Sequence, residues 1–283
     1  MNLVDAINSI NSTSTAKESD YKPIGVTNKD RSHRIKAFII TLFNDGEATY
    51  ASRKLMESIY ESGSWIDPYI MDATTPRWIR KHLAKIYDEE TANNIQYTWP
   101  VEGENYCKQT GLFRKAYRAA DYRKVMACTV SHLRLWKLCV EINEPIMVLE
   151  SDAIFYRTFR YDMLTEFGFR GICGLNEPFY ATRKPAVFNN NLTDYIKREG
   201  LNPVGVFPCP AVDNIGDPPL PQGLAGNSAY VIKPWAAKLL IDKTKEVGIW
   251  PNDALMCKQL FPFLQVTYPY YTRVQKLKST TTS

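Results

Sequence analysis

The sequence predicts an α/β protein built on a parallel sheet. Two short apolar runs, residues 35–42 and 66–71, flank a segment at 48–62 in which apolar residues recur with helical spacing. A third run at 145–149, Pro-Ile-Met-Val-Leu, is typical of a strand buried on both faces. Because a strand, a helix and a second strand in this order form a β-α-β unit, the first two strands are expected to be parallel.

The remaining elements are predicted in order along the chain. Asn-Asp-Gly at residues 44–46 turns the chain, and Gly63 is placed to end the first helix, on which Leu55, Ile59 and Tyr60 share one side. We then predict helices at 78–87, 118–141, 234–247 and 253–260, and strands at 170–175, 228–232 and 263–268, the last of which closes the sheet.

Residues 202–223 are dense in proline and glycine, which indicates the absence of regular structure. A loop of this length inside a compact domain is usually a lid or a binding surface. We expect a polar N-terminal extension at 1–34, a single domain at 35–275 and a polar tail at 276–283.

Bulk composition is that of an ordinary globular protein. The 283 residues carry a net charge of +5, which suggests an anionic ligand without requiring one. The six cysteines have neither a CxxC pair nor zinc-type spacing, so we expect reduced thiols and an intracellular protein. Neither a signal-peptide pattern nor an apolar run long enough for a bilayer is present, which predicts a cytoplasmic location or one at a membrane surface.

Glu150 and Asp152 carry the strongest functional signal. They follow the run at 145–149, at the carboxyl end of a predicted buried strand, where open α/β sheets bind ligands. Side chains alternate along a strand, so both carboxylates can point the same way. Two anions held together favour a hard divalent cation that also bridges phosphates. The alternative is that both acids merely begin a solvated loop.

Two further segments are considered for a ligand site. Gly226-Asn227-Ser228 lies where the chain would approach a ligand closely, although a plain turn before a strand explains it equally well. His132 lies on the apolar stripe of its helix, so a satisfied core histidine is the preferred interpretation. Ser131 beside it either touches a ligand or faces the backbone.

A basic stretch leads into the strand that ends at Glu150. Residues 108–137 carry many cations against the single acid Asp121, interleaved with aromatic residues. A solvated helix face is the ordinary explanation for such a run. Because this run precedes the acidic pair, we expect some of its cations to serve a diphosphate, an anionic glycan or a nucleic-acid backbone.

Together these pieces resemble glycosyltransferase family 25, the lipooligosaccharide (LPS) biosynthesis type, over about residues 36–275. The resemblance is carried by Arg53 after the first strand, Cys128-Thr-Val-Ser131-His132 with Trp136-Lys137, Val148-Leu-Glu-Ser-Asp152, Ala225-Gly-Asn-Ser-Ala-Tyr-Val-Ile232, Asp253 and Tyr268-Pro269. It implies a GT-A-like, Rossmann-type mixed sheet flanked by helices, and a nucleotide-sugar donor, usually a UDP-sugar. The family has Glu-Asp-Asp where this chain has Glu-Ser-Asp, which removes one charge; we still expect the metal to be kept.

Sugar transfer assigns roles to these residues. Mn²⁺ or Mg²⁺ would neutralise the leaving diphosphate, with Asp152 as the first-choice metal ligand and, through the metal, a catalytic residue. Glu150 either joins the metal, holds the donor ribose or braces the site. Asp253 is the candidate base for the acceptor hydroxyl, with a helix N-cap as the alternative role. The expected donor-binding set is Thr41, Leu42, Asn44, Arg53, Ser131, Glu150, Gly226, Asn227 and Ser228.

The family implies inversion by a single displacement, with a saccharide hydroxyl as the expected acceptor. One alternative acceptor is a hydroxymethylated base of phage-type DNA, which would have to leave the duplex stack. The chain would then work in the cytoplasm of the phage's host, whereas a glycan acceptor fits the cytoplasm or the face of the inner membrane. A second alternative is a non-catalytic nucleotide- or glycan-binding module, because Ser151 replaces an acid.

Overall fold

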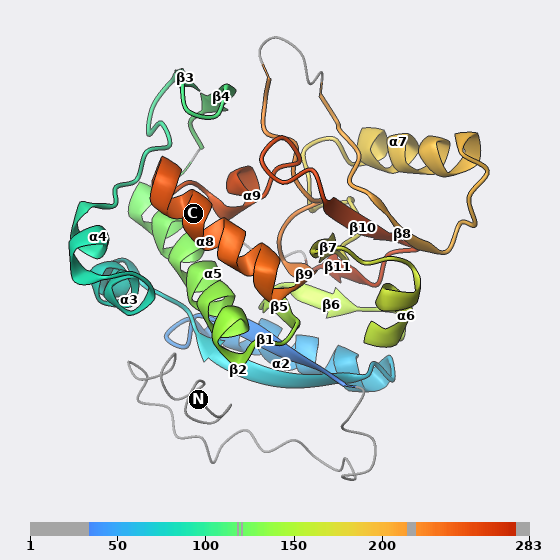
Figure 1. The fold of residues 1–283 in the computed structure, drawn as a ribbon. Coiled ribbons are helices and arrows are strands. Elements are labelled where there is room, and N and C mark those ends of the chain that lie inside the picture. The colour runs from blue at the N-terminus through green and yellow to red at the C-terminus, as the bar shows by residue number, and fades with distance from the viewer. Residues whose placement is uncertain (1–33, 118, 120, 214–218, 276–283) are drawn as a thin grey trace.

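The computed structural model describes residues 34–117, 119, 121–213 and 219–275, so most of the predicted extension and the predicted tail lie outside it. Within these residues a seven-stranded sheet has the order β2-β1-β5-β9-β7-β10-β8 (Figure 1). Its strands are β1 (Ile35–Thr41), β2 (Ile66–Asp72), β5 (Ile146–Glu150), β7 (Ile172–Gly174), β8 (Gly205–Pro208), β9 (Ala229–Ile232) and β10 (Leu264–Tyr268).

The sheet is mixed, which confirms the predicted class of an α/β sheet flanked by helices. Strand β1 pairs in parallel with β2 and β5, as the β-α-β pattern predicts, and β10 is parallel to β7. Strand β9 runs antiparallel between β5 and β7, and β8 runs antiparallel to β10. The carboxyl ends of β1, β2 and β5 therefore share one edge of the sheet with the start of β9.

Helices cover both faces of this sheet. They are α2 (Gly46–Glu61), the 3-10 turn η3 (Pro76–Trp78), α3 (Ile79–Ile86), α4 (Glu89–Asn94), α5 (Tyr122–Ile142), α6 (Tyr161–Glu166), α7 (Pro185–Arg198), α8 (Pro234–Val247) and α9 (Asn252–Leu255). Two short sheets complete the described chain: a hairpin of β3 (Glu104–Cys107) with β4 (Leu112–Lys115), and β6 (Ala153–Phe155) paired with β11 (Thr272–Val274).

Alternating side chains of the sheet form two apolar layers. Along β5, Ile146 and Val148 join a cluster that contains residues of α5 and α8, whereas Met147 and Leu149 join one that contains residues of α2. All four are fully buried, and each contributes about 1.5–3 kcal/mol to folding. Helices α5 and α8 lie together on one face and α2 on the other (Figure 1).

Helix α2 begins and ends where polar and glycine signals predict. The Asp45 carboxylate accepts a hydrogen bond from the Ala48 N–H at 2.9 Å, and Gly63 follows the helix at φ +65°. Leu55 and Ile59 are buried as expected. Tyr60, however, is 40% exposed, because consecutive helical residues point about 100° apart.

Helix α5 begins at Tyr122, four residues after the predicted start at 118. Asp121 has extended backbone angles, and its carboxylate accepts from the Arg123 N–H at 2.9 Å, which makes it the N-cap. The helix ends at Asn143, which adopts the left-handed conformation at φ +51°.

Two predictions on the C-terminal half were wrong. The stretch at 202–223 contains β8, and β8 rather than β10 forms the edge of the sheet. Pro208 is tolerated because an edge strand has one side without ladder bonds. Helix α9 ends at Leu255, well before the predicted residue 260. The short elements α4, α6 and the β3–β4 hairpin were not predicted, and neither was α7, although its buried residues Phe188, Leu192 and Ile196 recur at helical spacing.

The six cysteines are free, as predicted for reduced thiols. In the part of the chain that the structure describes, no helix has both the length and the apolar character needed to cross a membrane.

Candidate active site

A cleft of about 970 Å³ opens at the edge where β1 and β5 end and β9 begins. Its wall runs from the residues that follow β1 and β2, across the end of β5, to the residues before β9 and the first turn of α9. Nine predicted site residues line it: Leu42, Asn44, Ser131, Glu150, Asp152, Gly226, Asn227, Ser228 and Asp253. Segments far apart in the sequence thus converge on one cavity.

Two predicted donor-binding residues are absent from this lining. Thr41 is buried, and its hydroxyl lies 2.6 Å from the Ser52 hydroxyl of α2. Strand alternation sends Thr41 to the α2 face, whereas Ile40 and Leu42 line the cleft. Arg53 lies on the exposed face of α2 and does not line the cleft either.

The acidic pair lies at the centre of the lining. The Glu150 N–H donates to the Ser228 carbonyl at 2.8 Å, which fixes the end of β5 beside the start of β9. Asp152 lies in the turn that follows. Gln275 holds this turn: its N–H donates to the Asp152 carbonyl at 2.6 Å, and its side-chain amide nitrogen lies 3.2 Å from the Ser151 carbonyl. No local pattern in the sequence marks Gln275 for this role.

The cleft concentrates negative charge. Burial raises the pKa of Asp152 to about 7, and the neighbouring charge of Glu150 contributes to the rise. Burial also raises the pKa of the Cys128 thiol well above its ordinary value, with further contributions from Glu150, Asp253 and Asp152. Three groups of the cleft, Cys128, Asp152 and Asp253, therefore have raised pKa values, an arrangement that is typical of functional sites.

The oxygen atoms of the cleft fit a hard divalent cation. The Oδ1 atoms of Asp152 and Asn227 are buried and have no hydrogen-bond partner among the described residues, and such oxygens are preferred ligands of Mg²⁺. Ligand atoms of Cys128, His132 and Glu150 also lie within 4.8 Å of one another. That group fits a metal less well, because both ring nitrogens of His132 are hydrogen bonded and the thiol of Cys128 resists ionisation.

Asp253 reaches the cleft from α9. Its Oδ1 atom accepts a hydrogen bond from the Tyr117 hydroxyl at 2.7 Å. Asp253 is exposed to solvent. Desolvation by the surrounding protein raises the pKa of its carboxyl; the bond from Tyr117 opposes this rise and the charge of Glu150 adds to it. The alternative role as helix cap was wrong, because the N-cap of α9 is Pro251 and no side chain caps this helix.

Helix α5 contacts two parts of the cleft wall through the adjacent residues Ser131 and His132. The Ser131 hydroxyl accepts from the Thr74 N–H at 2.9 Å, beyond the end of β2, and donates to the Ala127 carbonyl at 3.0 Å. His132 is fully buried and hydrogen bonded, which confirms the core interpretation. Its bond to Glu150, at 3.0 Å, was not expected from the helical pattern alone.

Gly226 lines the cleft and also permits a close approach of another segment of the protein. It adopts φ +73°, and a Cβ atom there would lie 2.9 Å from the Ala181 carbonyl oxygen. Beside Ala181, Tyr180 lines the cleft, is 72% exposed and also has a positive φ of 66°. A left-handed conformation is uncommon for a tyrosine and is often found at functional sites.

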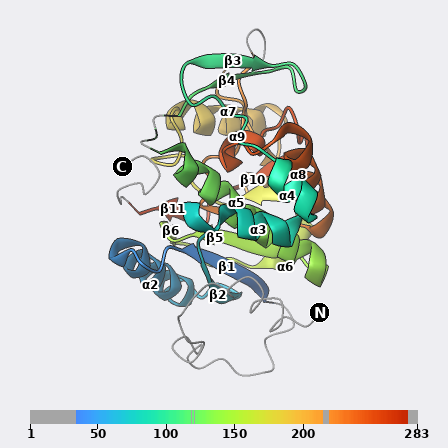
Figure 2. The same ribbon diagram turned by 90° about the vertical axis from the view of Figure 1, so that its left-hand side faces the viewer.

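The basic stretch contributes less to the cleft than predicted. Among its described cations only Lys124 belongs to the lining. Four others contact protein groups: Arg114 with Asn105, Arg123 with Asp121, Arg134 with the Asp72 carbonyl and Lys137 with Glu141. Arg118 lies outside the described residues. The hairpin that carries Arg114 stands at one end of the molecule (Figure 2).

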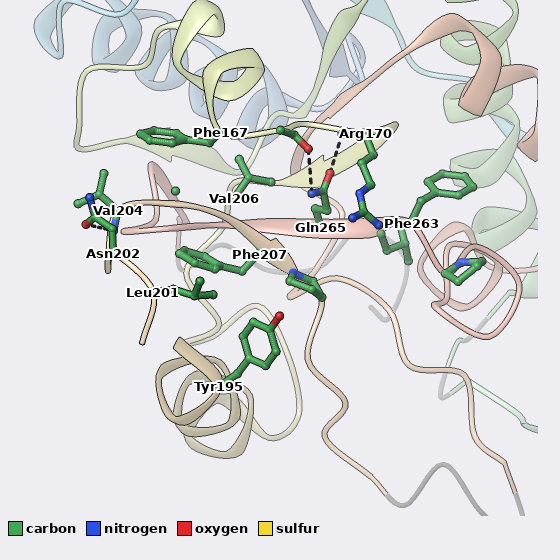
Figure 3. Close-up of a pocket in the computed structure, with 15 residues that line it drawn as sticks. Phe167, Arg170, Tyr195, Leu201, Asn202, Val204, Val206, Phe207, Phe263 and Gln265 are labelled. Atoms are coloured by element: carbon green, nitrogen blue, oxygen red, sulfur yellow. Dashed lines mark hydrogen bonds between the residues drawn. The ribbon is translucent and has the colours of Figure 1, made fainter. Parts of the chain in front are cut away.

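A second pocket, of about 410 Å³, lies between α7 and the edge strand β8 (Figure 3). The Gln265 side chain accepts from the Arg170 N–H at 2.7 Å and donates to the Gly168 carbonyl at 3.3 Å. The side-chain Oδ1 atom of Asn202 accepts from the Val204 N–H at 3.1 Å. None of the predicted site residues lines this pocket.

Residues 123–256 match the model of glycosyltransferase family 25 (LPS biosynthesis protein), which confirms the predicted resemblance. The matched span includes Glu150, Asp152 and Asp253 and supports glycosyltransferase activity. Together with the mixed sheet, it agrees with the expected GT-A-like class. A comparison with curated proteins gives no match.

Several solved glycosyltransferase structures are similar to this chain. The galactosyltransferase LgtC, in complex with donor and acceptor sugar analogues, is 11% identical with a TM-score of 0.37, over 82% of this chain and 73% of LgtC. Mouse xyloside xylosyltransferase 1 is 10% identical with a TM-score of 0.36, over 83% and 84% of the two chains. The bifunctional glycosyltransferase WbbM is 11% identical with a TM-score of 0.38, over 88% of this chain and 40% of WbbM.

Proposed function

We propose that this chain transfers a sugar from a nucleotide-sugar donor, with UDP-sugars as the first candidates, to a saccharide hydroxyl by a single inverting displacement. The observation that carries the proposal is the convergence of Glu150, Asp152 and Asp253 on one cleft at the edge where β5 ends. The Asp152 Oδ1 atom has no hydrogen-bond partner among the described residues, as expected of a group kept for a ligand.

The nucleoside end of the donor is assigned to the part of the cleft beside β1 and β2. Leu42, Asn44 and the segment at 73–76 line this part. Thr74 is held firmly, because its N–H donates to Ser131 and its hydroxyl accepts from Arg134 at 3.2 Å. A rigid wall of this kind positions a ligand without losing further conformational entropy on binding.

The diphosphate is assigned to the end of β5. Asp152 and Glu150 would hold Mn²⁺ or Mg²⁺, with the Asn227 side-chain oxygen within the same lining. A bound cation would neutralise the charge that develops on the departing nucleoside diphosphate. Replacement of the middle acid by Ser151 leaves the two outer carboxylates of the motif in place.

Asp253 is the proposed general base. In the displacement, the acceptor oxygen forms a bond to the anomeric carbon, the bond from that carbon to the diphosphate breaks, and the acceptor proton moves to Asp253. A raised pKa makes this carboxylate a stronger base than an ordinary aspartate. Tyr117 donates to its Oδ1 atom and so orients it towards the acceptor.

A panel of nucleotide sugars, incubated with and without Mn²⁺ or Mg²⁺, tests this function. We expect donor hydrolysis that requires the cation and that falls more than roughly 100-fold in Asp152→Asn, because loss of even an outer partner of a metal ligand costs 10–100-fold. Asp242→Asn is the matched control. Asp242 lies on α8, pairs with Lys238 and is absent from the cleft lining.

The remaining outcomes of the panel separate the alternatives. Binding of a nucleotide sugar without hydrolysis or transfer under any condition would identify a binding module instead. Transfer to duplex DNA with hydroxymethylated bases but not to glycans, together with binding that weakens steeply with salt, would replace the saccharide acceptor by DNA.

A further inference from the structure

A buried hydrogen-bonded chain links the core to Glu150. The indole N–H of Trp136 donates to the Tyr230 hydroxyl at 2.8 Å, and this hydroxyl lies 2.9 Å from Nδ1 of His132. The other ring nitrogen, Nε2, lies 3.0 Å from Oε1 of Glu150. Trp136, Tyr230 and His132 are each 0% exposed, and His132 and Trp136 lie one turn apart on α5.

The chemistry of the four groups sets the direction of every bond. An indole N–H only donates, so the Tyr230 oxygen accepts from Trp136. Among the described residues, Nδ1 of His132 is the remaining partner of this hydroxyl, so the tyrosine proton points to Nδ1. The ring proton of His132 is then on Nε2, where it donates to Glu150.

The other tautomer leaves groups without a partner. A proton on Nδ1 would place the lone pair of Nε2 against the Glu150 carboxylate and leave the tyrosine proton without an acceptor. Each such loss is costly in a buried site.

We infer that Trp136 and Tyr230 lock His132 in its Nε2–H tautomer, and that His132 thereby holds the Glu150 carboxylate in one orientation at the cleft. His132 is therefore a positioning residue, which acts through Glu150. The inference rests on the proposed function for its effect on catalysis, but the tautomer itself does not depend on it.

Nitrogen NMR of the protein labelled with ¹⁵N-histidine tests the tautomer directly. The chain has three histidines, and the signals of His132 are assigned by their loss in His132→Gln. We expect His132 to be protonated on Nε2 alone in the wild type. In Tyr230→Phe, which removes only the hydroxyl, we expect the Nδ1 signal to shift. A wild-type proton on Nδ1 would overturn the inference.

Kinetics test the positioning role. Tyr230→Phe should lower kcat by roughly 10–100-fold and raise the cation concentration needed for half activation, as for other partners that orient a metal ligand. Tyr87→Phe is the matched control: it also removes a tyrosine hydrogen bond from the core, to the Ile241 carbonyl at 2.9 Å, remote from Glu150. Thermal unfolding confirms that both variants fold. Equal kcat in the two variants would contradict the role.

Conservative replacement of the histidine provides a second test. The His132→Gln side chain offers an N–H near the position of Nε2, whereas His132→Met has a similar size and no donor. We expect His132→Gln to retain more activity, and equal loss in the two would contradict the role. If the wild type itself lacks transfer and hydrolysis, the proposed function fails, while the NMR experiment still decides the tautomer.

Discussion

The cleft and the second pocket lie at different parts of one sheet and differ in how their polar groups are satisfied. In the second pocket, Gln265 and Asn202 are bonded to neighbouring backbone groups (Figure 3). In the cleft, the Oδ1 atoms of Asp152 and Asn227 are buried without a partner among the described residues. A hollow alone is therefore a weak indication of chemistry in this molecule; unpaired acceptors at the sheet edge where β5 ends and β9 begins are a stronger one.

The largest expected effect concerns the proposed base. Asp253→Asn keeps the size of the side chain but cannot accept the acceptor proton, so we expect transfer to fall about 10²–10⁴-fold with little change in donor binding. Transfer rates and calorimetric donor binding measure the two quantities. An unchanged transfer rate would show that another residue is the base. Asp242→Asn again serves as the control for the substitution itself.

The ionised Asp152 carboxylate should also lower the stability of the folded protein at neutral and alkaline pH. The pKa of Asp152 is about 7 in the folded protein, against an ordinary value of 3.8. The contribution of this carboxyl to the free energy of unfolding is therefore fully present below pH 3.8, where it is neutral in both states. That contribution is lost as pH rises to about 7, because the unfolded chain ionises first. In chelator, Asp152→Asn should therefore be more stable than the wild type above pH 7, by about 2–4 kcal/mol. The difference should disappear near pH 3.5, as measured by urea unfolding across pH.

Addition of a cation sharpens the same measurement. A cation that binds the folded wild type stabilises it by mass action, and Asp152→Asn should lose this response. If Mg²⁺ or Mn²⁺ stabilises both proteins equally, Asp152 is not a ligand.

The smallest expected effect is on stability, and it is seen by comparing one glycine of the cleft with one glycine of the second pocket. Gly226 of the cleft and Gly168 of the second pocket have similar positive φ values, +73° and +75°. A Cβ atom at Gly168 meets open space, whereas at Gly226 it lies 2.9 Å from the Ala181 carbonyl. Both Gly→Ala variants carry about 1–2 kcal/mol of backbone strain, and Gly226→Ala should lose about 1–3 kcal/mol more. Equal losses of unfolding free energy in Gly226→Ala and Gly168→Ala would show that the segment around Ala181 moves to make room for the added methyl group.

The sequence was sufficient to predict the parts of the fold that have strong local signals. The β-α-β unit, the cap at Asp45 and the buried strand before Glu150 each follow from periodicity or from one residue type, and each is confirmed. Strand β8 was missed because its pairing with β10 outweighs a local composition that favours a loop.

The same limit applies to the cleft. Motif order indicated nine of its lining residues, because the parallel strands β1, β2 and β5 end at one edge of the sheet. The partners that hold those residues, directly or through His132, were not visible: Gln275, Tyr117 and Tyr230 make contacts across separations of 98 to 136 residues. Thr41 and Arg53 were misplaced for a simpler reason, since the pattern of one element does not say which face the neighbouring layer occupies.

The contact of Gln275 with the acidic turn has a consequence for biosynthesis. The turn at 151–153 and Gln275, which holds it, are separated by more than 120 positions. During synthesis, Glu150 and Asp152 are therefore present in the nascent chain long before Gln275 is translated. The cleft can reach its final shape only when almost the whole described chain has emerged from the exit tunnel.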